Sequence, residues 1–314
     1  METLYLVVPC YNEEEVLPET STQLLCKLTS LVERGIVSDE SRILLVDDGS
    51  KDKTWEMITD LHEGNSYFAG IKLARNMGHQ NALLAGLMTA KEVADITISL
   101  DADLQDDIDA IDHFIEKYND GCDVVYGVRS ARKTDTFFKR NTAHGFYSIM
   151  RSMGVEIIDD HADYRLMSKR AVEGLAEFRE VNLFLRGIVP LIGYTSGVVE
   201  YERKERFAGE SKYPLRKMLN FALDGITSFS IKPIRLVTTI GLMIFLASLA
   251  MLVYFLVLKL LDKTVPGWTT LVMSIWMIGG IQLLSLGVIG EYIGKIYKEV
   301  KDRPKYIIQQ YINK

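Results

Sequence analysis

Two long apolar segments near the C-terminus constrain the fold of this chain more than any other feature. From Ile234 to Leu258 the only charged residue is Arg235, and from Trp268 to Gly290 there is none. A helix rises about 1.5 Å per residue, so either segment can cross a hydrocarbon core of about 30 Å. Helices buried in a soluble core are the alternative, but such helices rarely run this long without a charge. The sequence therefore predicts a helical hairpin that spans a membrane.

Basic residues predict how this hairpin is oriented. The segments before and after the two spans are rich in Lys and Arg, whereas the short loop between them carries only Lys259 and Lys263 as basic residues. The positive-inside rule then places both flanks, and with them both termini, on the cytoplasmic face of the inner (plasma) membrane. The N-terminus lacks a basic region followed by an apolar stretch, so we expect no signal peptide. Gly279, Gly280 and Gly287 would permit close helix packing between two copies, which leaves a homo-oligomer open.

The segment before the first span has the pattern of an amphipathic helix. Apolar residues from Leu215 to Ile226 recur at helical spacing, and Arg216 and Lys217 lie off that stripe. Such a helix can lie on the membrane surface or pack on a soluble domain. The expected organisation is a cytoplasmic domain over residues 1–212, this helix over 213–232, two spans at about 234–258 and 268–290, and a cytoplasmic tail over 291–314.

The N-terminal two thirds of the chain alternate between strand and helix patterns. Short runs rich in Val, Ile and Leu are separated by helical patterns, which is typical of an α/β fold with a mainly parallel, Rossmann-like sheet. In such sheets ligands bind beyond the carboxyl ends of the strands. The predicted strands are Thr3–Pro9, Arg42–Val46, Phe68–Leu73, Ile96–Leu100 and Asp123–Tyr126.

Charge and cysteine content exclude several classes of protein. The 36 Lys and Arg residues are outnumbered by 42 Asp and Glu residues, which gives a net charge of −6 and disfavours binding of nucleic acid through a basic surface. The 3 cysteines are too few and too scattered for a disulfide framework or a cysteine metal cluster. With these classes excluded, the polar residues at the strand ends are the remaining candidates for binding a ligand.

Polar residues follow each of these strands, and the fourth strand is followed by a cluster of carboxylates. Asp101 and Asp103 are two residues apart, so in an extended segment their side chains point the same way. Two such carboxylates repel one another unless a cation lies between them, and hard oxygen ligands suit Mg²⁺ or Mn²⁺ holding a diphosphate. Gln105 repeats the spacing. His79, after the third strand, could donate to a substrate or could be a solvated turn residue.

Together these motifs resemble the family 2 glycosyltransferases of the GT-A fold, in particular the polyprenyl-phosphate glycosyltransferases such as the dolichol-phosphate mannose synthases and the bacterial GtrB-like enzymes. The resemblance implies inverting transfer of a sugar from a UDP-sugar to undecaprenyl phosphate or a similar lipid, with Mg²⁺ or Mn²⁺, at the cytoplasmic membrane face. The motifs that carry it are VPCYNEE at 8–14, DDGS at 47–50, LARNMGHQNALLAG at 73–86, DADLQD at 101–106, GVR at 127–129, DYRLMS at 163–168 and RFAGESKY at 206–213.

The resemblance also assigns roles to individual residues. The nucleotide is expected at Pro9, Tyr11, Glu13, Asp47, Asp101, Ala102 and Asp103. The metal is expected at Asp101, Asp103 and Gln105. The acceptor phosphate is expected at Arg129, Arg206, Ser211 and Lys212. The expected catalytic residues are Asp103, Asp163, Arg129, Arg206 and Lys212.

The chemistry of the acceptor bears on the role of Asp163. A phosphate monoester with a second pKa of about 6 is already mostly ionised at neutral pH, so it needs a general base less than a sugar hydroxyl does. We therefore expect Asp163 to position groups or to stabilise the oxocarbenium ion rather than to act as an obligatory base. The resemblance favours UDP-glucose as the donor, followed by UDP-N-acetylglucosamine.

Two other functions compete with this interpretation. A processive polysaccharide synthase of the same superfamily would carry a Q-x-x-R-W motif. That motif is missing here, since none of the tryptophans, Trp55, Trp268 and Trp276, stands at the end of such a sequence. A non-enzymatic nucleotide-binding membrane scaffold, or a flippase partner, would not need the Asp101–Asp103 pair or the RFAGESKY loop. Both alternatives predict no single-sugar lipid product.

Overall fold

The structure separates a folded α/β unit from the helical hairpin. The computed structural model describes residues 1–129, 161–180, 185–202, 232–260 and 267–313. The N-terminal unit also contains the residues from Arg303 onward, which follow the hairpin in sequence. The predicted amphipathic helix lies outside the described residues over 213–231.

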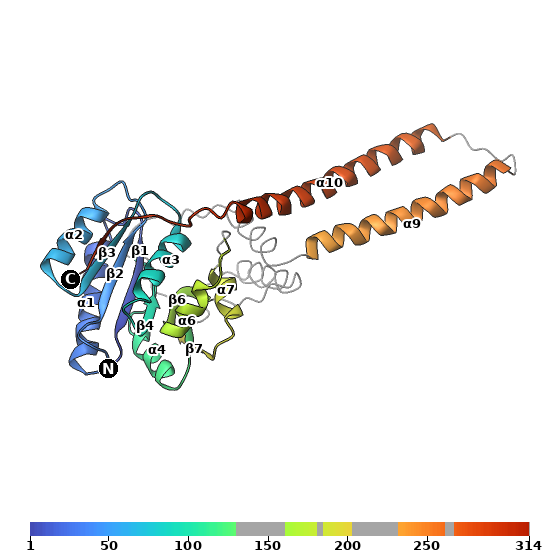
Figure 1. Cartoon of the computed structure of the whole chain (residues 1–314). Helices are drawn as coiled ribbons and strands as arrows, with labels where there is room; N and C mark the ends of the chain where they lie inside the picture. The colour runs from blue at the N-terminus through green and yellow to red at the C-terminus, as the bar shows by residue number, and fades with distance from the viewer. Residues whose placement is uncertain (130–160, 181–184, 203–231, 261–266, 314) are drawn as a thin grey trace. The chain divides into compact units, whose positions relative to one another are not determined.

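The alternation of strand and helix predicted for the N-terminal region is confirmed (Figure 1). All the predicted strands are present, and each of the first four is followed by a helix. The elements are β1 (Leu4–Cys10), α1 (Leu17–Glu33), β2 (Arg42–Asp47), α2 (Thr54–Gly64), β3 (Phe68–Leu73), α3 (His79–Ala90), β4 (Ile96–Ser99), α4 (Ala110–Asn119) and β5 (Val124–Arg129).

Of the later elements, the two hairpin helices were predicted, whereas β6, α6, α7, β7 and β8 were not. Strand β6 follows a gap in the described residues and leads directly into α6, whose first turn is capped by the side chain of Ser168. The elements are β6 (His161–Ser168), α6 (Lys169–Ala176), α7 (Leu185–Leu191), β7 (Ser196–Tyr201), α9 (Lys232–Leu260), α10 (Trp268–Val300) and β8 (Ile308–Ile312).

The sheet has 8 strands in the order β7-β5-β6-β4-β1-β2-β3-β8. Strands β1 to β5 and β7 run in one direction, and β6 and β8 run in the other. The fold class is therefore the predicted one, α/β with a mainly parallel sheet. Because β6 is antiparallel to β4, with Arg165 opposite Ser99, the start of β6 lies at the edge where β4 ends. This reversal brings Asp163 to the edge of the sheet where the parallel strands have their carboxyl ends, called here the carboxyl-end edge.

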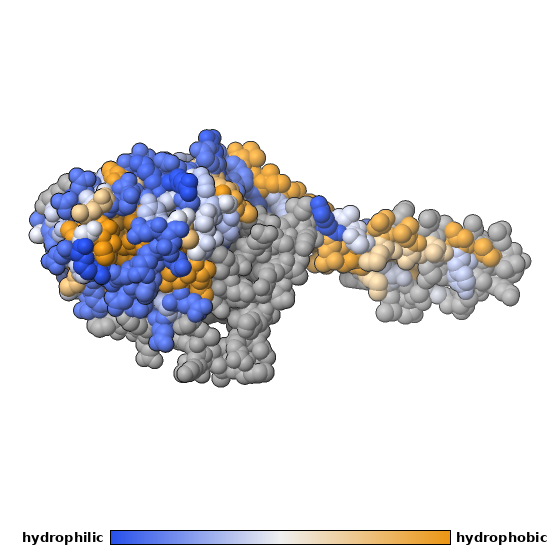
Figure 2. All heavy atoms as spheres, turned by 90° about the horizontal axis from the view of Figure 1, so that it is seen from below, coloured by the Kyte–Doolittle hydropathy of each residue, from blue (hydrophilic) through white to orange (hydrophobic). Residues whose placement is uncertain are grey.

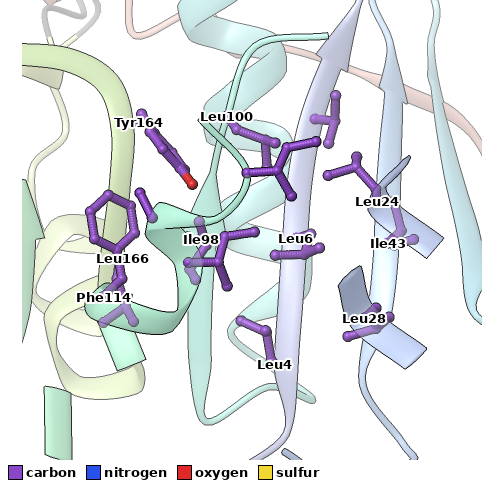
Figure 3. Close-up of a cluster of buried hydrophobic side chains, with 14 of the residues drawn as sticks. Leu4, Leu6, Leu24, Leu28, Ile43, Ile98, Leu100, Phe114, Tyr164 and Leu166 are labelled. Atoms are coloured by element: carbon purple, nitrogen blue, oxygen red, sulfur yellow. The ribbon is translucent and has the colours of Figure 1, made fainter. Parts of the chain in front are cut away.

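Alternation along the strands divides the buried residues between two faces of the sheet. Leu4 and Leu6 of β1 point toward α1, where Leu24 and Leu28 meet them in one continuous apolar cluster (Figure 3). Each of these side chains is fully buried. The same cluster includes residues of α2 and α4, so these helices cover the same face as α1. Apolar burial of this extent is the main stabilising contribution to such a fold.

Helix α3 packs against the opposite face, and Gly86 sets how close it can come. Val7 and Val46 alternate with the residues of the first cluster, so their side chains point to the α3 side. A Cβ atom on Gly86 would lie 2.9 Å from Cγ2 of Val46 and closer still to Cγ1 of Val7. A residue larger than glycine would have to push the helix away from the sheet.

We expect Gly86→Ala to lower the free energy of unfolding by about 1–3 kcal/mol, because overpacking a dense core forces shifts of backbone and side chains. This loss should appear even though Ala is the better helix former by about 1 kcal/mol. Gly64→Ala at the end of α2 is the matched control, since no atom lies within 4 Å of its Cβ position. Denaturant unfolding of both variants in detergent tests the prediction, which fails if Gly86→Ala is as stable as the control.

The last strand comes from the segment expected to be only a tail. Strand β8 pairs antiparallel with β3, and the amide of Ala74 donates to the carbonyl of Ile307 at 2.9 Å. Gly70 leaves room for Ile312, whose Cγ1 would lie 3.0 Å from a Cβ on that glycine. Figure 1 shows the red C-terminal segment returning to the sheet beside β3. The chain therefore leaves the α/β unit before the hairpin and rejoins it afterwards.

The hairpin helices expose their apolar side chains. Helices α9 and α10 contain the predicted spans 234–258 and 268–290, and α10 continues to Val300. Leu283 and Leu284 are 71% and 67% exposed, and Figure 2 shows hydrophobic residues in orange along these helices. In the part of the chain that the structure describes, one helical segment is long and apolar enough to cross a membrane, Met277–Val300, and none of it is buried. This exposure disfavours helices of a soluble core.

An ion pair joins Asp123, the residue before β5, to Arg170 of α6; the carboxylate is buried, whereas the Arg170 side chain is 63% exposed. The carboxylate of Asp123 accepts from Nε and Nη2 of Arg170, and from the hydroxyl of Ser168 at 2.8 Å. The hydroxyl of Ser168 also accepts from the amide of Ala171 and so caps α6. The hydrogen bonds from Arg170 hold the pKa of Asp123 below its ordinary value, although burial acts in the other direction.

This pair predicts a pH-dependent contribution to stability. A carboxyl group whose pKa is depressed by folding stabilises the protein above its unfolded pKa of about 4, and the contribution is lost as the pH falls through the folded pKa. We expect Asp123→Asn to lower the melting temperature at pH 7 and to lower it less as the pH approaches 3. Asp120→Asn, at an exposed position on the same loop, is the control. A difference that does not change with pH would contradict the prediction.

Candidate active site

The loops that follow β1 and β2 are bonded to one another at the carboxyl-end edge. The amide of Asn12 donates to Oγ of Ser50 at 3.0 Å, and the amide of Glu13 donates to Oγ1 of Thr54 at 2.9 Å. Asn12 has a φ of 54°, a left-handed conformation that Asn tolerates. In this frame Pro9 is buried and Tyr11 is 41% exposed. An exposed ring on a fixed loop suits stacking on a base.

The two aspartates after β2 have different tasks. Asp48 accepts from the amides of Met77 and Gly78 at 2.7 and 2.9 Å, so it holds the loop that precedes α3. Asp47 accepts from the amide of Ser50 at 3.0 Å through Oδ1, whereas its Oδ2 is buried and has no hydrogen-bond partner among the described residues. Asp47 therefore keeps an acceptor that a ligand hydroxyl or a base could satisfy.

Gly49 is required between these loops. Its φ is +66°, and a Cβ atom would lie 2.6 Å from the carbonyl carbon of Arg75 and from the amide nitrogen of Asn76. The close approach explains why a glycine follows the two aspartates. It brings the third loop, with His79 at its end, against the second.

The geometry predicted for Asp101 and Asp103 is wrong. Strand β4 ends at Ser99, and the chain turns at Ala102 and Asp103 instead of staying extended. Oδ1 of Asp103 accepts from the amide of Gln105 at 3.2 Å, and Leu104 has a φ of 55°. The turn, and not alternation along a strand, sets the directions of these carboxylates, because the backbone must leave the sheet before α4.

Asp101 lies among other carboxylates. Burial raises the pKa of Asp101 to about 6, and the carboxylates of Asp106 and Asp163 add to the rise. His79 opposes it, with its Nε2 3.5 Å from Oδ1 of Asp101. A carboxylate that is desolvated beside other carboxylates is poised to bind a cation.

The donor set fits a divalent metal that is completed by a substrate. No group of three or more His, Cys, Asp or Glu side chains in the described ranges is arranged to hold a metal. Asp101 and Asp103 offer hard oxygen atoms, and Mg²⁺ is usually bound by one or two carboxylates together with water and substrate phosphates. Gln105 is 9% exposed and its part as a further ligand stays a prediction.

Asp163 lies at the centre of a group of cationic side chains. Its Oδ1 accepts from Nη2 of Arg165 at 2.6 Å, and Arg186 donates through Nε to Oδ1 at 3.3 Å and through Nη2 to Oδ2 at 3.1 Å. Nε2 of His79 is 3.7 Å from Oδ2. Burial raises the pKa of Asp163, but Arg186, His79 and Arg165 outweigh it and hold that pKa well below its ordinary value. A carboxylate held this way is a weak base.

Arg129 ends β5 and joins a second group. It donates through Nη2 to Oδ1 of Asp106 and through Nε to the hydroxyl of Tyr201, each at 3.3 Å. Tyr201 in turn donates to Oδ1 of Asp106 at 2.6 Å. Oδ2 of Asp106 is buried without a hydrogen-bond partner within the described part of the chain. The Arg129 guanidinium is therefore held at the carboxyl-end edge of the sheet, and its binding of the acceptor phosphate stays a prediction.

Some predicted residues meet here and others cannot be placed. Asp101, Asp103, Asp163 and Arg129 lie on loops and strand ends of one edge. Arg206, Ser211 and Lys212 lie outside the described residues. The sequence did not single out Arg165, Arg186, Asp106 or Tyr201. The position of Arg165, two residues after Asp163 on one strand, was the one available signal.

Comparisons with known proteins identify both parts of the chain. The model of the family described as Glycosyl transferase family 2 matches residues 5–175, and that of the GtrB C-terminal hairpin matches residues 232–296. A solved structure of glucosyl-3-phosphoglycerate synthase from Mycobacterium tuberculosis is 16% identical, with a TM-score of 0.46 over 72% of this chain and 78% of the other.

Relatives of similar length extend over almost the whole chain. An uncharacterized glycosyltransferase, YkoT, from Bacillus subtilis is 56% identical over 97% of this chain and 90% of the relative. A prophage-derived bactoprenol glucosyl transferase from Shigella flexneri is 42% identical over 97% of each. Together with the sheet and its acidic edge, these matches show that the chain belongs to glycosyltransferase family 2 and is a transferase with a GtrB-type C-terminal hairpin.

Proposed function

We propose that this enzyme transfers glucose from UDP-glucose to undecaprenyl phosphate and so makes a lipid-linked sugar for modification of cell-envelope glycans. The observation that carries the proposal is the meeting of opposite charges at one edge: the Asp101–Asp103 turn beside arginines of β5 and α7. The carboxylates of the turn suit a metal-bound diphosphate, and the arginines suit phosphate oxygens. The relatives named as bactoprenol glucosyl transferases support this choice of substrates.

The residues of the edge divide the work of the reaction. The bond between the anomeric carbon and the UDP oxygen breaks, and a bond from that carbon to an acceptor phosphate oxygen forms. A divalent cation bound at Asp101 and Asp103 would neutralise charge on the departing diphosphate. We assign binding of the nucleoside to Asp47, which keeps a buried acceptor atom, and to the exposed Tyr11, and we assign to Arg129 the offsetting of repulsion between the two substrates.

The acceptor needs little help to become a nucleophile. Its phosphate is already ionised at neutral pH, because its second pKa is about 6. Asp163 accepts hydrogen bonds from Arg165 and Arg186, and it is a weak base because these charges stabilise its ionised form. Its carboxylate instead stabilises positive charge and fixes the arginines around it.

Chain connectivity supports a location at the cytoplasmic face. Strands β7 and β8 belong to one sheet, yet the hairpin lies between them in sequence. A chain that leaves and rejoins one folded unit must cross the membrane an even number of times. Two crossings fit α9 and α10, and the basic flanks then place the α/β unit in the cytoplasm.

The test uses full-length protein in liposomes that contain undecaprenyl phosphate, with Mn²⁺ and labelled UDP-glucose or UDP-N-acetylglucosamine. We expect one sugar per lipid, with UDP-glucose the better donor. Binding of UDP without any lipid-linked product would favour the scaffold alternative, and a polymer would favour a processive synthase. Arg34→Gln, at a surface ion pair with Asp112, should leave the product unchanged.

A further inference from the structure

Arg186 lies in the first turn of the short helix α7, whose first residue, Leu185, is fixed from two sides. The amide of Leu185 donates to Oε1 of Gln80 at 3.0 Å, and the carbonyl of Leu185 accepts from Nη1 of Arg165 at 3.4 Å. The Arg186 side chain then reaches Asp163 with two parallel N–H groups, at 3.3 and 3.1 Å. Such a bidentate pair fixes the plane of the guanidinium.

Asp163 does not need Arg186 to balance its charge. Arg165 is 2% exposed and donates to Oδ1 of Asp163 at 2.6 Å, so one buried arginine already neutralises the carboxylate. Arg186 therefore adds a second positive charge beside Asp163. Its side chain is 31% exposed, and among the described residues Asp163 is its only hydrogen-bond partner. A guanidinium has five N–H groups, so others remain for a ligand.

The Arg186 guanidinium lies within electrostatic range of both Asp101 and Arg129. Burial lowers the pKa of Arg186, but Asp163 outweighs burial and Asp101 adds to the rise, whereas Arg129 acts in the opposite direction. Asp101 and Arg129 are thus both near enough to influence this guanidinium. In the proposed function Asp101 binds the metal and the diphosphate and Arg129 binds the acceptor phosphate, so Arg186 is close to both kinds of phosphate group.

From this geometry we infer that Arg186 is a phosphate-binding residue of the active site, which Asp163 holds in a fixed orientation. The inference rests on the proposed function for the identity of the substrates. Its ligand is a phosphate oxygen, either of the diphosphate of the nucleotide-sugar or of the lipid phosphate. A lysine at this position would keep the charge but lose the planar, two-sided contact.

The test compares Arg186→Gln and Arg186→Lys with Arg34→Gln in the liposome assay. We expect Arg186→Gln to lower kcat/KM on the order of 100-fold, Arg186→Lys to lower it less, and Arg34→Gln to have no effect. A rise confined to the KM of UDP-glucose assigns the contact to the diphosphate, and a rise confined to the KM of undecaprenyl phosphate assigns it to the acceptor. Unchanged kinetics for Arg186→Gln would overturn the inference.

A double variant separates binding of phosphate from support of Asp163. If Arg186 only positions Asp163, Arg186→Gln has no further effect in an Asp163→Asn background, and the inference is overturned. A further loss in that background supports direct contact. If the wild type transfers no sugar at all, the proposed function fails, but calorimetric titration with UDP and with undecaprenyl phosphate still tests Arg186. Weaker binding of either by Arg186→Gln supports the inference, and equal binding of both overturns it.

Discussion

Asp163→Asn is expected to lower sugar transfer on the order of 100-fold or more and also to destabilise the α/β unit. The loss of transfer follows because the variant releases the bidentate contact that orients Arg186 and removes the negative charge that we propose to stabilise the oxocarbenium ion. The loss of stability follows because Arg165, 2% exposed, would keep a buried charge without its partner. Breaking a buried pair from one side costs about 3–5 kcal/mol. Initial rates in liposomes and melting temperatures in detergent measure the two effects.

A second substitution separates the two effects. Arg165→Met in the Asp163→Asn background removes the orphaned charge, so it should restore much of the melting temperature without restoring transfer. Asp123→Asn is the control for transfer. It also removes a buried carboxylate from an arginine but lies away from the acidic turn, so it should leave transfer unchanged. Near-normal turnover of Asp163→Asn would contradict the role given to Asp163.

Strands β1 to β5 could be predicted because each is a short apolar run, mostly buried, between polar turns, whereas β6 and β7 were not predicted. Strand β8 could not be predicted, because Ile308–Ile312 includes two glutamines and lies at the edge of the sheet, where most of its residues are exposed. Its position depends on Gly70 and Ile312, which are far apart in the sequence. Patterns of local hydrophobicity carry no information about such a pairing.

The site was predicted in part for a wrong reason. Asp101 and Asp103 do lie at the edge, but a turn and not an extended strand directs them. Arg186 could not be predicted, since it meets Asp163 only because β6 runs antiparallel to β4 and α7 is anchored by Gln80. Contacts of this kind depend on the order of strands, which no short motif records.

Removing the carboxylates of Asp101 and Asp103 is expected to have the second large effect. Asp101→Asn and Asp103→Asn should each lower transfer on the order of 100-fold or more, since a site with few protein ligands loses much of its metal affinity with either one. Chelation of divalent cations should inactivate the wild type, and added Mn²⁺ or Mg²⁺ should restore it. Rates after dialysis against EDTA, with and without each metal, measure this dependence.

Asp101→Asn should make the metal-free protein more stable while it inactivates the enzyme. Asp101 is crowded by the carboxylates of Asp106 and Asp163, so a neutral side chain at this position relieves repulsion that the fold otherwise tolerates for its function. A metal that binds only the folded state raises the melting temperature of the wild type, and it should raise that of Asp101→Asn much less. Lys27→Met, which breaks an ion pair between α1 and α4, is the control that should keep the full response to Mn²⁺. An equal response of Asp101→Asn and the wild type would show that the metal binds elsewhere, because the crowded carboxylate would then have no part in holding it.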